Sequence, residues 1–280
     1  MKNQFQSAEH HEKFQYFHAL HYTGKTLILP NAWDCISARM FAECGFPTIA
    51  TTSAGVAWSL GYKDGEHLPA QLLIETTARI CKSVTVPVSA DIESGYFGED
   101  LEGFALFIKQ LIEIGVVGVN IEDVDENSRN LVALDHQLAK IQVAKQMAKQ
   151  MGTDLFVNAR TDAMEKQEGD SAHKISVCKT RIKAFSKAGA DGVFVPFIPD
   201  FETVETIQAA TTLPLNIMMS PSFSIASLRQ IKVARVSIGV KPILATMHTI
   251  KQLSVMLQQQ EDWHNLYPND PNYPTVNSWF

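Results

Sequence analysis

Three acidic residues lie at the ends of two neighbouring apolar runs of this sequence. Asp91 and Glu93 belong to the end of the run that starts at Val86, and Glu122 follows the next run, Val117–Ile121. In an extended chain, side chains two residues apart point to the same face, so Asp91 and Glu93 are expected to converge. Carboxylates gathered at one place repel one another unless a cation or protons neutralise them. All-oxygen ligands suit Mg²⁺, with Mn²⁺ as the alternative cation. The same acids could equally be helix caps and solvated loop residues.

A basic residue ends the apolar run Leu155–Ala159. The guanidinium of Arg160 could bind a substrate carboxylate or phosphonate through two parallel hydrogen bonds. An ion pair with Glu122 or Asp162 alone is the alternative role.

The segment Ser53, Ala54 and Gly55 follows another apolar run, Thr48–Thr51. It offers a hydroxyl and backbone N–H groups that could bind an anion. A plain turn from a strand into a loop explains the same residues equally well.

Short apolar runs alternate with longer amphipathic segments through the chain. Continuous apolar character is typical of parallel strands that helices cover. We expect eight strands, over Leu27–Pro30, Thr48–Thr51, Val86–Ile92, Val117–Ile121, Leu155–Ala159, Gly192–Val195, Leu215–Met218 and Arg235–Ile238. The expected helices are Ile36–Cys44, Pro69–Lys82, Asp100–Ile114, His136–Met151, Lys174–Ala188, Asp200–Ala210 and Ser224–Ile231. This alternation favours an α/β fold, a (β/α)₈ TIM barrel, over an open doubly wound sheet. In such a barrel the candidate residues share the mouth at the C-terminal ends of the strands.

The two ends of the chain fall outside this alternation. Residues 1–24 are expected to form a helix that caps the barrel bottom, with His10, His11, His18 and His21 solvated. Residues 1–260 then make a single barrel domain. Residues 261–280 contain prolines among aromatic residues and are expected to be an irregular tail, packed on its own or a neighbouring subunit.

Composition excludes several classes of partner. The chain has 24 Lys and Arg against 30 Asp and Glu, a formal net charge of -6, which argues against nucleic acid. No apolar run approaches the roughly 20 residues of a membrane-spanning helix, and the polar N-terminus is no signal peptide. The four cysteines have no CxxC spacing, so we expect reduced, mostly buried thiols and a cytoplasmic location.

Five ordered motifs carry a family resemblance. The strings PNAWD, TTSAG, SADIESGYFG, GVNIED and NARTDA resemble successive motifs of the phosphoenolpyruvate mutase/isocitrate lyase superfamily, over about residues 27–250. The resemblance implies a (β/α)₈ barrel whose last helix is exchanged between subunits, in a homodimer or homotetramer. It also implies Mg²⁺-stabilised enolate chemistry on a small carboxylate substrate, with cleavage of a C–C or P–C bond.

The resemblance also implies roles for particular residues. Asp91 would be the principal Mg²⁺ ligand, and Glu93 and Glu122 would hold the metal mainly through water. Glu93 stands where the family commonly has Asp. The implied catalytic residues are Arg160, Glu122 and Asp64, and the implied substrate-binding residues are Ser53, Ala54, Gly55, Trp33, Arg160 and Asn216.

Departures from the family pattern reduce the number of reactions that the resemblance allows. The stretch after the fourth predicted strand, residues 124–132, lacks the lyases' cysteine acid, although Asn127 or Asn130 could serve as a gate. Pro196 and Met218 replace polar residues that would bind a further carboxylate. These losses point to a small 2-oxo acid such as oxaloacetate. Phosphonate mutase or hydrolase chemistry, and a barrel that binds a carboxylate without turnover, stay open as alternatives.

Overall fold

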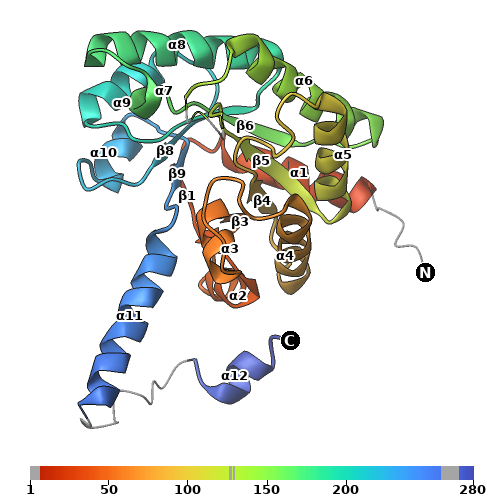
Figure 1. Ribbon diagram of the computed structural model, residues 1–280, viewed down its shortest axis with the longest axis vertical. Helices are drawn as coiled ribbons and strands as arrows, with labels where there is room; N and C mark the ends of the chain where they lie inside the picture. Colours follow the sequence, from red (N-terminus) through yellow and green to blue (C-terminus); the bar gives the residue numbers. More distant parts are fainter. Residues whose placement is uncertain (1–6, 126–127, 129, 260–270) are drawn as a thin grey trace.

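All strands of the protein run parallel and form one nearly closed barrel (Figure 1). The computed structural model describes residues 7–125, 128, 130–259 and 271–280. The order around the barrel is β1-β9-β8-β7-β6-β5-β4-β3-β2. The strands are β1 Leu27–Leu29, β2 Asn31–Ala32, β3 Ile49–Thr51, β4 Val88–Asp91, β5 Val116–Ile121, β6 Phe156–Arg160, β7 Gly192–Val195, β8 Leu215–Met218 and β9 Arg235–Ser237. This topology confirms the predicted (β/α)₈ barrel.

The first predicted strand is split in two at Pro30, which has no N–H to give to a strand ladder. β1 pairs with β9 and β2 pairs with β3, so the two halves join the ends of the sheet. The nine short strands are therefore equivalent to the eight that were predicted.

Helices flank the barrel on its outside (Figure 1). They are α1 Ser7–Leu20, α2 Cys35–Glu43, α3 Ser53–Ser59, α4 Ala70–Ser83, α5 Leu101–Glu113, α6 Leu134–Gln150, α7 Ala163–Lys166, α8 Ser171–Ala188, α9 Phe201–Gln208, α10 Ile225–Gln230, α11 Lys241–Gln258 and α12 Tyr273–Asn277. The helices α3, α7, α11 and α12 are not among those expected over particular residues of the sequence, and α3 and α7 begin almost directly at the ends of β3 and β6. Thr52 caps α3, since its hydroxyl accepts from the Gly55 amide.

Helix α1 plugs the bottom of the barrel, as the sequence predicted. Phe17 is fully buried among Leu29, Val117 and Phe156, and its ring lies edge-on to Phe156 at 5.3 Å between centroids. Gly118 on β5 leaves the space for it, because a Cβ there would lie 3.0 Å from the Phe17 ring.

The expectation that His10 and His21 are solvated is wrong. His10 contacts the Val116 carbonyl at 2.7 Å and the Thr153 hydroxyl at 2.8 Å. His21 stacks on Phe156 at 4.3 Å between ring centroids and contacts the Phe17 carbonyl at 2.9 Å. Both rings are buried and make hydrogen bonds inside the protein. They hold α1 and the residues just after it against the barrel.

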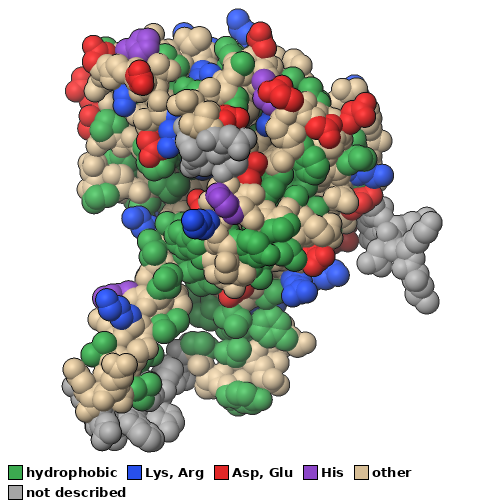
Figure 2. Space-filling view, viewed as in Figure 1, with side chains coloured by type: hydrophobic (Ala, Val, Ile, Leu, Met, Phe, Trp, Pro, Cys, Tyr) green, Lys and Arg blue, Asp and Glu red, His purple; other side chains and the backbone are tan. Residues whose placement is uncertain are grey.

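Helix α11 projects away from the barrel (Figure 1). It buries one residue, Ile243, and exposes large apolar side chains at Leu244, Met247, Ile250, Val255 and Leu257. In the space-filling view, the barrel side near α2, α3 and α4 also shows mainly hydrophobic side chains, whereas most acidic side chains lie higher up (Figure 2). Exchange of this helix between subunits stays a prediction.

The tail differs from the irregular segment that was expected. A five-residue helix, α12, forms at its end, where Asn272 caps the helix and Pro274 lies in the first turn. Proline is tolerated there because the first turn has no internal partner for its missing N–H.

The described cysteines are all free, as expected, but only Cys178 is buried, whereas Cys44 is exposed. Among the described helices, none combines the length and apolar character needed to cross a membrane.

Candidate active site

Asp91 ends β4 and faces the start of α3 across the barrel mouth. Its Oδ2 accepts from the Ser53 hydroxyl at 3.2 Å and, more weakly, from the Ser53 amide at 3.4 Å. Its own amide donates to the Thr51 hydroxyl at 2.9 Å. Burial raises the pKa of Asp91, while the charge of Arg160 opposes that shift and the charge of Asp64 adds to it. The structure thus brings Ser53 and Asp91 into contact, while Asp64 is exposed and lies near enough for its charge to act on Asp91.

Glu93 reaches the same mouth by a different route from the one predicted. β4 ends at Asp91 and Glu93 has a left-handed backbone, φ 52°. The extended-chain argument for the convergence of Asp91 and Glu93 is therefore wrong. The Glu93 carboxylate instead accepts from the Glu66 amide at 2.6 Å and from the Tyr96 hydroxyl at 2.9 Å. Burial, followed by the charge of Asp64, raises the pKa of Glu93 to about 8.

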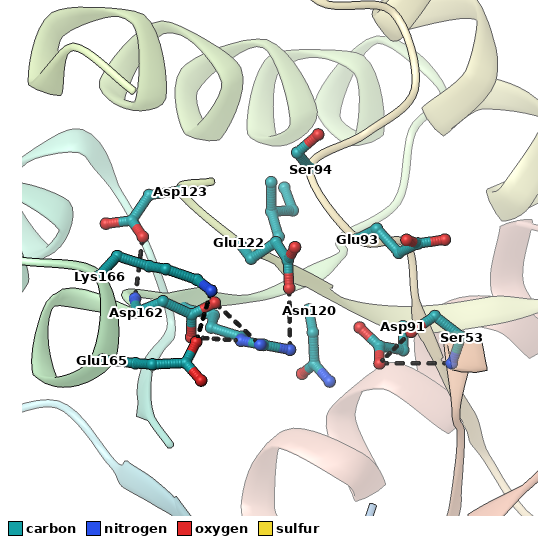
Figure 3. A network of polar contacts seen from close by, with 12 residues as sticks. Ser53, Asp91, Glu93, Ser94, Asn120, Glu122, Asp123, Asp162, Glu165 and Lys166 are labelled. Carbon is teal, nitrogen blue, oxygen red and sulfur yellow. Dashed lines mark hydrogen bonds and ion pairs between the residues drawn. The ribbon is translucent and has the colours of Figure 1, made fainter. Parts of the chain in front are cut away.

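Glu122 and Asp162, both labelled in Figure 3, lie at the ends of β5 and β6, and Arg160 forms an ion pair with each of them. Its Nη1 is 2.9 Å from Glu122 Oε2, and its Nε and Nη2 each donate to Asp162 at 2.9 Å. The Phe194 ring centroid lies 5.6 Å from the guanidinium carbon. Burial raises the pKa of Glu122 to about 8, although the charge of Arg160 opposes the shift. Both ion pairs considered from the sequence are present.

A second, buried ion pair, between Arg181 and Asp123, supports the residue that holds Arg160. Arg181 donates to Asp123 Oδ2 and to the Val132 carbonyl, the latter at 3.0 Å. Asp123 Oδ1 accepts from the Asp162 amide at 2.9 Å. The Asp123 carboxylate therefore fixes the backbone of the residue that holds Arg160.

Polar side chains also fill the barrel interior. Asn120 Oδ1 accepts from Asn158 at 2.8 Å and from the fully buried Arg235 at 3.3 Å. Asn216 is hydrogen-bonded to the Ser237 hydroxyl at 3.1 Å. Its amide is therefore engaged inside the barrel, and its contact with a substrate stays a prediction.

The remaining candidate residues border the Ser53 side of the mouth. Gly55 has no room for a side chain, since a Cβ would lie 2.6 Å from Thr52 Cγ2 and 3.0 Å from Trp33 Cβ. Trp33 is partly buried and its amide donates to Ser37 at 3.0 Å. Ala54 is 6% exposed. These contacts seat α3 against the first strand with its N-terminus at the mouth.

The donor set fits a hard cation held largely through water. Among the described residues, no three His, Cys, Asp or Glu side chains come close enough to enclose a metal. Burial raises the pKa values of Asp91, Glu93 and Glu122, although Arg160 pairs with Glu122, and a bound cation would favour the ionised form of all three acids. Mg²⁺ usually keeps several waters and binds through one or two carboxylates. An oxygen donor set of this kind is compatible with Mg²⁺ on Asp91.

The loop after β5 has a paired stem. Val124 forms an antiparallel bridge with Leu131, and the Asp125 amide donates to the Asn130 carbonyl at 2.8 Å. Of the two gate candidates, Asn130 is exposed and Asn127 lies outside the described residues. A gating role stays a prediction.

Sequence reasoning missed Glu66 and Lys140. Lys140 is 2% exposed and donates to the Ser94 carbonyl at 2.8 Å. Helical spacing could have found it, because it shares the buried face of α6 with Gln137, Ile141 and Ala144. No local pattern marks Glu66, which lies in a polar loop.

Comparisons with known proteins agree with this geometry. The sequence matches the phosphoenolpyruvate phosphomutase family over residues 17–257. It is 36% identical to an uncharacterized protein of Mycobacterium tuberculosis, over 83% of this chain and 84% of that protein. It is 28% identical to an oxaloacetate decarboxylase of Ectopseudomonas mendocina, over 76% of this chain and 72% of that protein. A crystal structure of a proposed phosphonomutase from Burkholderia cenocepacia J2315 superposes with a TM-score of 0.83 at 38% identity, over 87% of this chain and 99% of that one.

Proposed function

The chain belongs to the phosphoenolpyruvate phosphomutase family, and from that premise we propose that it is a Mg²⁺-dependent lyase that cleaves a small 2-oxo acid through a pyruvate enolate. Oxaloacetate is the first substrate to test, since a decarboxylase of it is among the relatives.

The observation that carries this proposal is the fixed position of Arg160. Three of its nitrogen atoms are held by Glu122 and Asp162, and the Phe194 ring lies beside it. A guanidinium held in this way presents its charge to a substrate oxyanion without first being ordered, which favours the charge that develops during cleavage.

Each residue then has a task in the reaction. Asp91 would hold the cation directly, and Glu93 and Glu122 through water; the bound cation supplies positive charge to the substrate's oxygen atoms. Ser53 and the N-terminus of α3 bind the substrate carboxylate. In oxaloacetate the C3–C4 bond breaks, carbon dioxide leaves, and the electron pair forms the enolate, which Arg160 stabilises. Solvent returns a proton to C3 and gives pyruvate.

The residues at the ends of β7 and β8, on the side of the mouth away from Ser53, favour a small substrate. The β7 end carries Pro196, and Met218 at the β8 end packs against Gly239, where a Cβ would lie 2.9 Å from the Met218 sulfur. Neither Pro196 nor Met218 can pair with an additional carboxylate. This lack of partners argues against a tricarboxylate substrate.

A second candidate function is P–C bond chemistry on a phosphonate. The 38% identity to the proposed phosphonomutase favours it, and Arg160 could bind a phosphonate as well as a carboxylate.

Product analysis separates the two candidates. Oxaloacetate, phosphonopyruvate and 2-methylisocitrate are each incubated with the protein, with Mg²⁺ and with EDTA, and pyruvate and phosphorus species are measured. Metal-dependent pyruvate from oxaloacetate supports the lyase proposal. Release of phosphate, or formation of a new phosphorus species from phosphonopyruvate, supports the second candidate. No turnover of any compound contradicts both.

A further inference from the structure

Two loops at the barrel mouth hold each other through reciprocal hydrogen bonds. One loop, residues 61–69, joins α3 to α4, and the other, residues 92–100, joins β4 to α5. The Glu66 amide donates to Glu93 Oε2 at 2.6 Å. In return, Glu66 Oε1 accepts from the Ser94 hydroxyl at 2.6 Å and the Tyr96 amide at 2.7 Å. We call these three hydrogen bonds the Glu66 clasp.

The clasp lies where the backbone is strained. Glu66, Glu93 and Tyr96 all have left-handed backbones, with φ of 55°, 52° and 69°. Such conformations cost about 1 kcal/mol or more for each residue that is not glycine. Three of them persist at one place because the hydrogen bonds of the clasp hold them there.

Further contacts hold the clasp from both sides. The Tyr96 hydroxyl donates to Glu93 Oε1 at 2.9 Å, so both carboxylate oxygens of Glu93 have donors. Lys140, nearly fully buried on α6, donates to the Ser94 carbonyl at 2.8 Å and lies within the electrostatic reach of Glu66. A buried cation thus compensates the Glu66 charge.

Asp64 lies on the first loop of the clasp. It precedes Glu66 by two residues, and its charge acts on both Asp91 and Glu93. The amide and the carboxylate of Glu66 together join this part of the first loop to residues 93–96 at the barrel mouth.

We propose that Glu66 is a positioning residue: through the clasp it holds Asp64 beside Asp91 and Glu93 and so keeps the carboxylates in the arrangement that binds the divalent cation. This inference rests on the proposed function, because it needs the cation. It also gives Glu93 a main task as a partner of the clasp, since its carboxylate is already engaged by the Glu66 amide and the Tyr96 hydroxyl.

The test compares four variants of the full chain without metal and then with Mn²⁺ alone. Glu66→Ala removes the acceptor, Glu66→Gln keeps an acceptor oxygen but no charge, and Ser94→Ala removes one hydrogen bond as a milder change. Glu99→Ala is the matched control on the same loop, since the Glu99 side chain is 90% exposed and pairs with His136 at the edge of α6, outside the clasp. Hydrogen exchange of peptides that cover residues 61–68 and 92–98 reports the clasp, and calorimetry reports Mn²⁺ affinity.

We expect faster exchange in both peptides and Mn²⁺ binding weaker by about tenfold or more in Glu66→Ala, as for other residues that orient metal ligands. Glu66→Gln keeps the acceptor oxygen but leaves Lys140 without the Glu66 charge, so it should lie between the wild type and Glu66→Ala. Ser94→Ala should also lie between, and Glu99→Ala should change neither readout. Unchanged exchange in Glu66→Ala and Ser94→Ala would refute the clasp. Faster exchange with unchanged Mn²⁺ affinity would refute its positioning role. A wild type that binds no Mn²⁺ contradicts the proposed function and the positioning role together, while the exchange data still decide whether the clasp exists.

Discussion

The guanidinium of Arg160 and the carboxylate of Asp162 form a two-point contact, Nε to Oδ1 and Nη2 to Oδ2, both at 2.9 Å. The two residues are only two positions apart, at the end of β6 and just before α7. The contact leaves Nη1 directed at Glu122. Arg160 is thus fixed in its plane before any substrate arrives, which distinguishes it from a flexible surface arginine.

Arg160→Lys should raise the KM for the substrate by about tenfold or more, because an ammonium cannot replace the planar fork that is held by Asp162. Steady-state kinetics on the identified substrate checks this. Arg39→Lys is the control, since Arg39 is a half-buried residue of α2 that pairs with Glu43 and donates to the Ser83 carbonyl, outside the candidate site. A KM equal to that of the wild type would remove Arg160 from substrate binding.

Arg181→Met should destabilise the fold by about 3–5 kcal/mol, because it leaves the carboxylate of Asp123 buried without its cation. Urea unfolding measures the loss. Adding Asp123→Asn to this variant should restore part of the stability, since the buried charge is then gone. A loss of less than about 1 kcal/mol would show that the pair is not needed, as for an exposed salt bridge.

Phe17→Ala should cost about 3–5 kcal/mol of stability, because it opens a cavity at the bottom of the barrel. Tyr16→Ala, one residue earlier and 50% exposed, is the matched control and should change stability little. Denaturant unfolding of both variants gives the comparison. Equal losses would mean that α1 does not plug the barrel through Phe17.

His21 should make the protein less stable in acid. Burial, followed by the charge of Arg235, lowers its pKa from 6.5 to about 3. The unfolded chain therefore binds the extra proton between these pH values, and the stability present above pH 6.5 is lost as pH falls towards 3. The slope due to one such proton is at most about 1.4 kcal/mol per pH unit.

His21→Phe keeps a ring to stack on Phe156 and removes the titration. Unfolding free energies at several pH values should fall less steeply with acid in this variant than in the wild type. Glu93 and Glu122 act in the opposite sense, because their raised pKa values add stability at low pH that is lost as pH rises through about 8. Their contributions cancel in the comparison, so identical slopes would contradict the assignment to His21.

The barrel could be predicted from the sequence because two hydrophobic patterns are strong: the continuous apolar runs of the strands and the one apolar face of the helices. Apolar runs such as Val117–Ile121 are buried on both faces, and helices such as α5 present one apolar face, so each element has one way to be covered. The strand boundaries were less certain. Pro30 divides the first strand, and α3 begins where a loop was expected, because Thr52 can cap a helix directly after β3.

The site was predictable where strand ends determine it and not where loops do. Asp91, Glu122 and Arg160 extend directly from their strands, so topology alone brings them to one mouth. Glu93 lies beyond the strand end, and its position depends on a left-handed backbone and on Glu66, which a sequence pattern cannot reveal. The burial of His10 and His21 likewise depends on how α1 packs on strands far away in the sequence.

The most direct test of the central claim is the rate of pyruvate formation from oxaloacetate. It is measured for the wild type and for Asp91→Ala, each with Mg²⁺ and with EDTA, and the rate without protein is subtracted. Asp154→Ala, an exposed partner of His11, is the control, and circular dichroism checks that each variant is folded. We predict Mg²⁺-dependent turnover by the wild type and the control, abolished by EDTA, and none by folded Asp91→Ala. Full activity of Asp91→Ala, or wild-type turnover that EDTA does not affect, would contradict a Mg²⁺-dependent lyase built on Asp91.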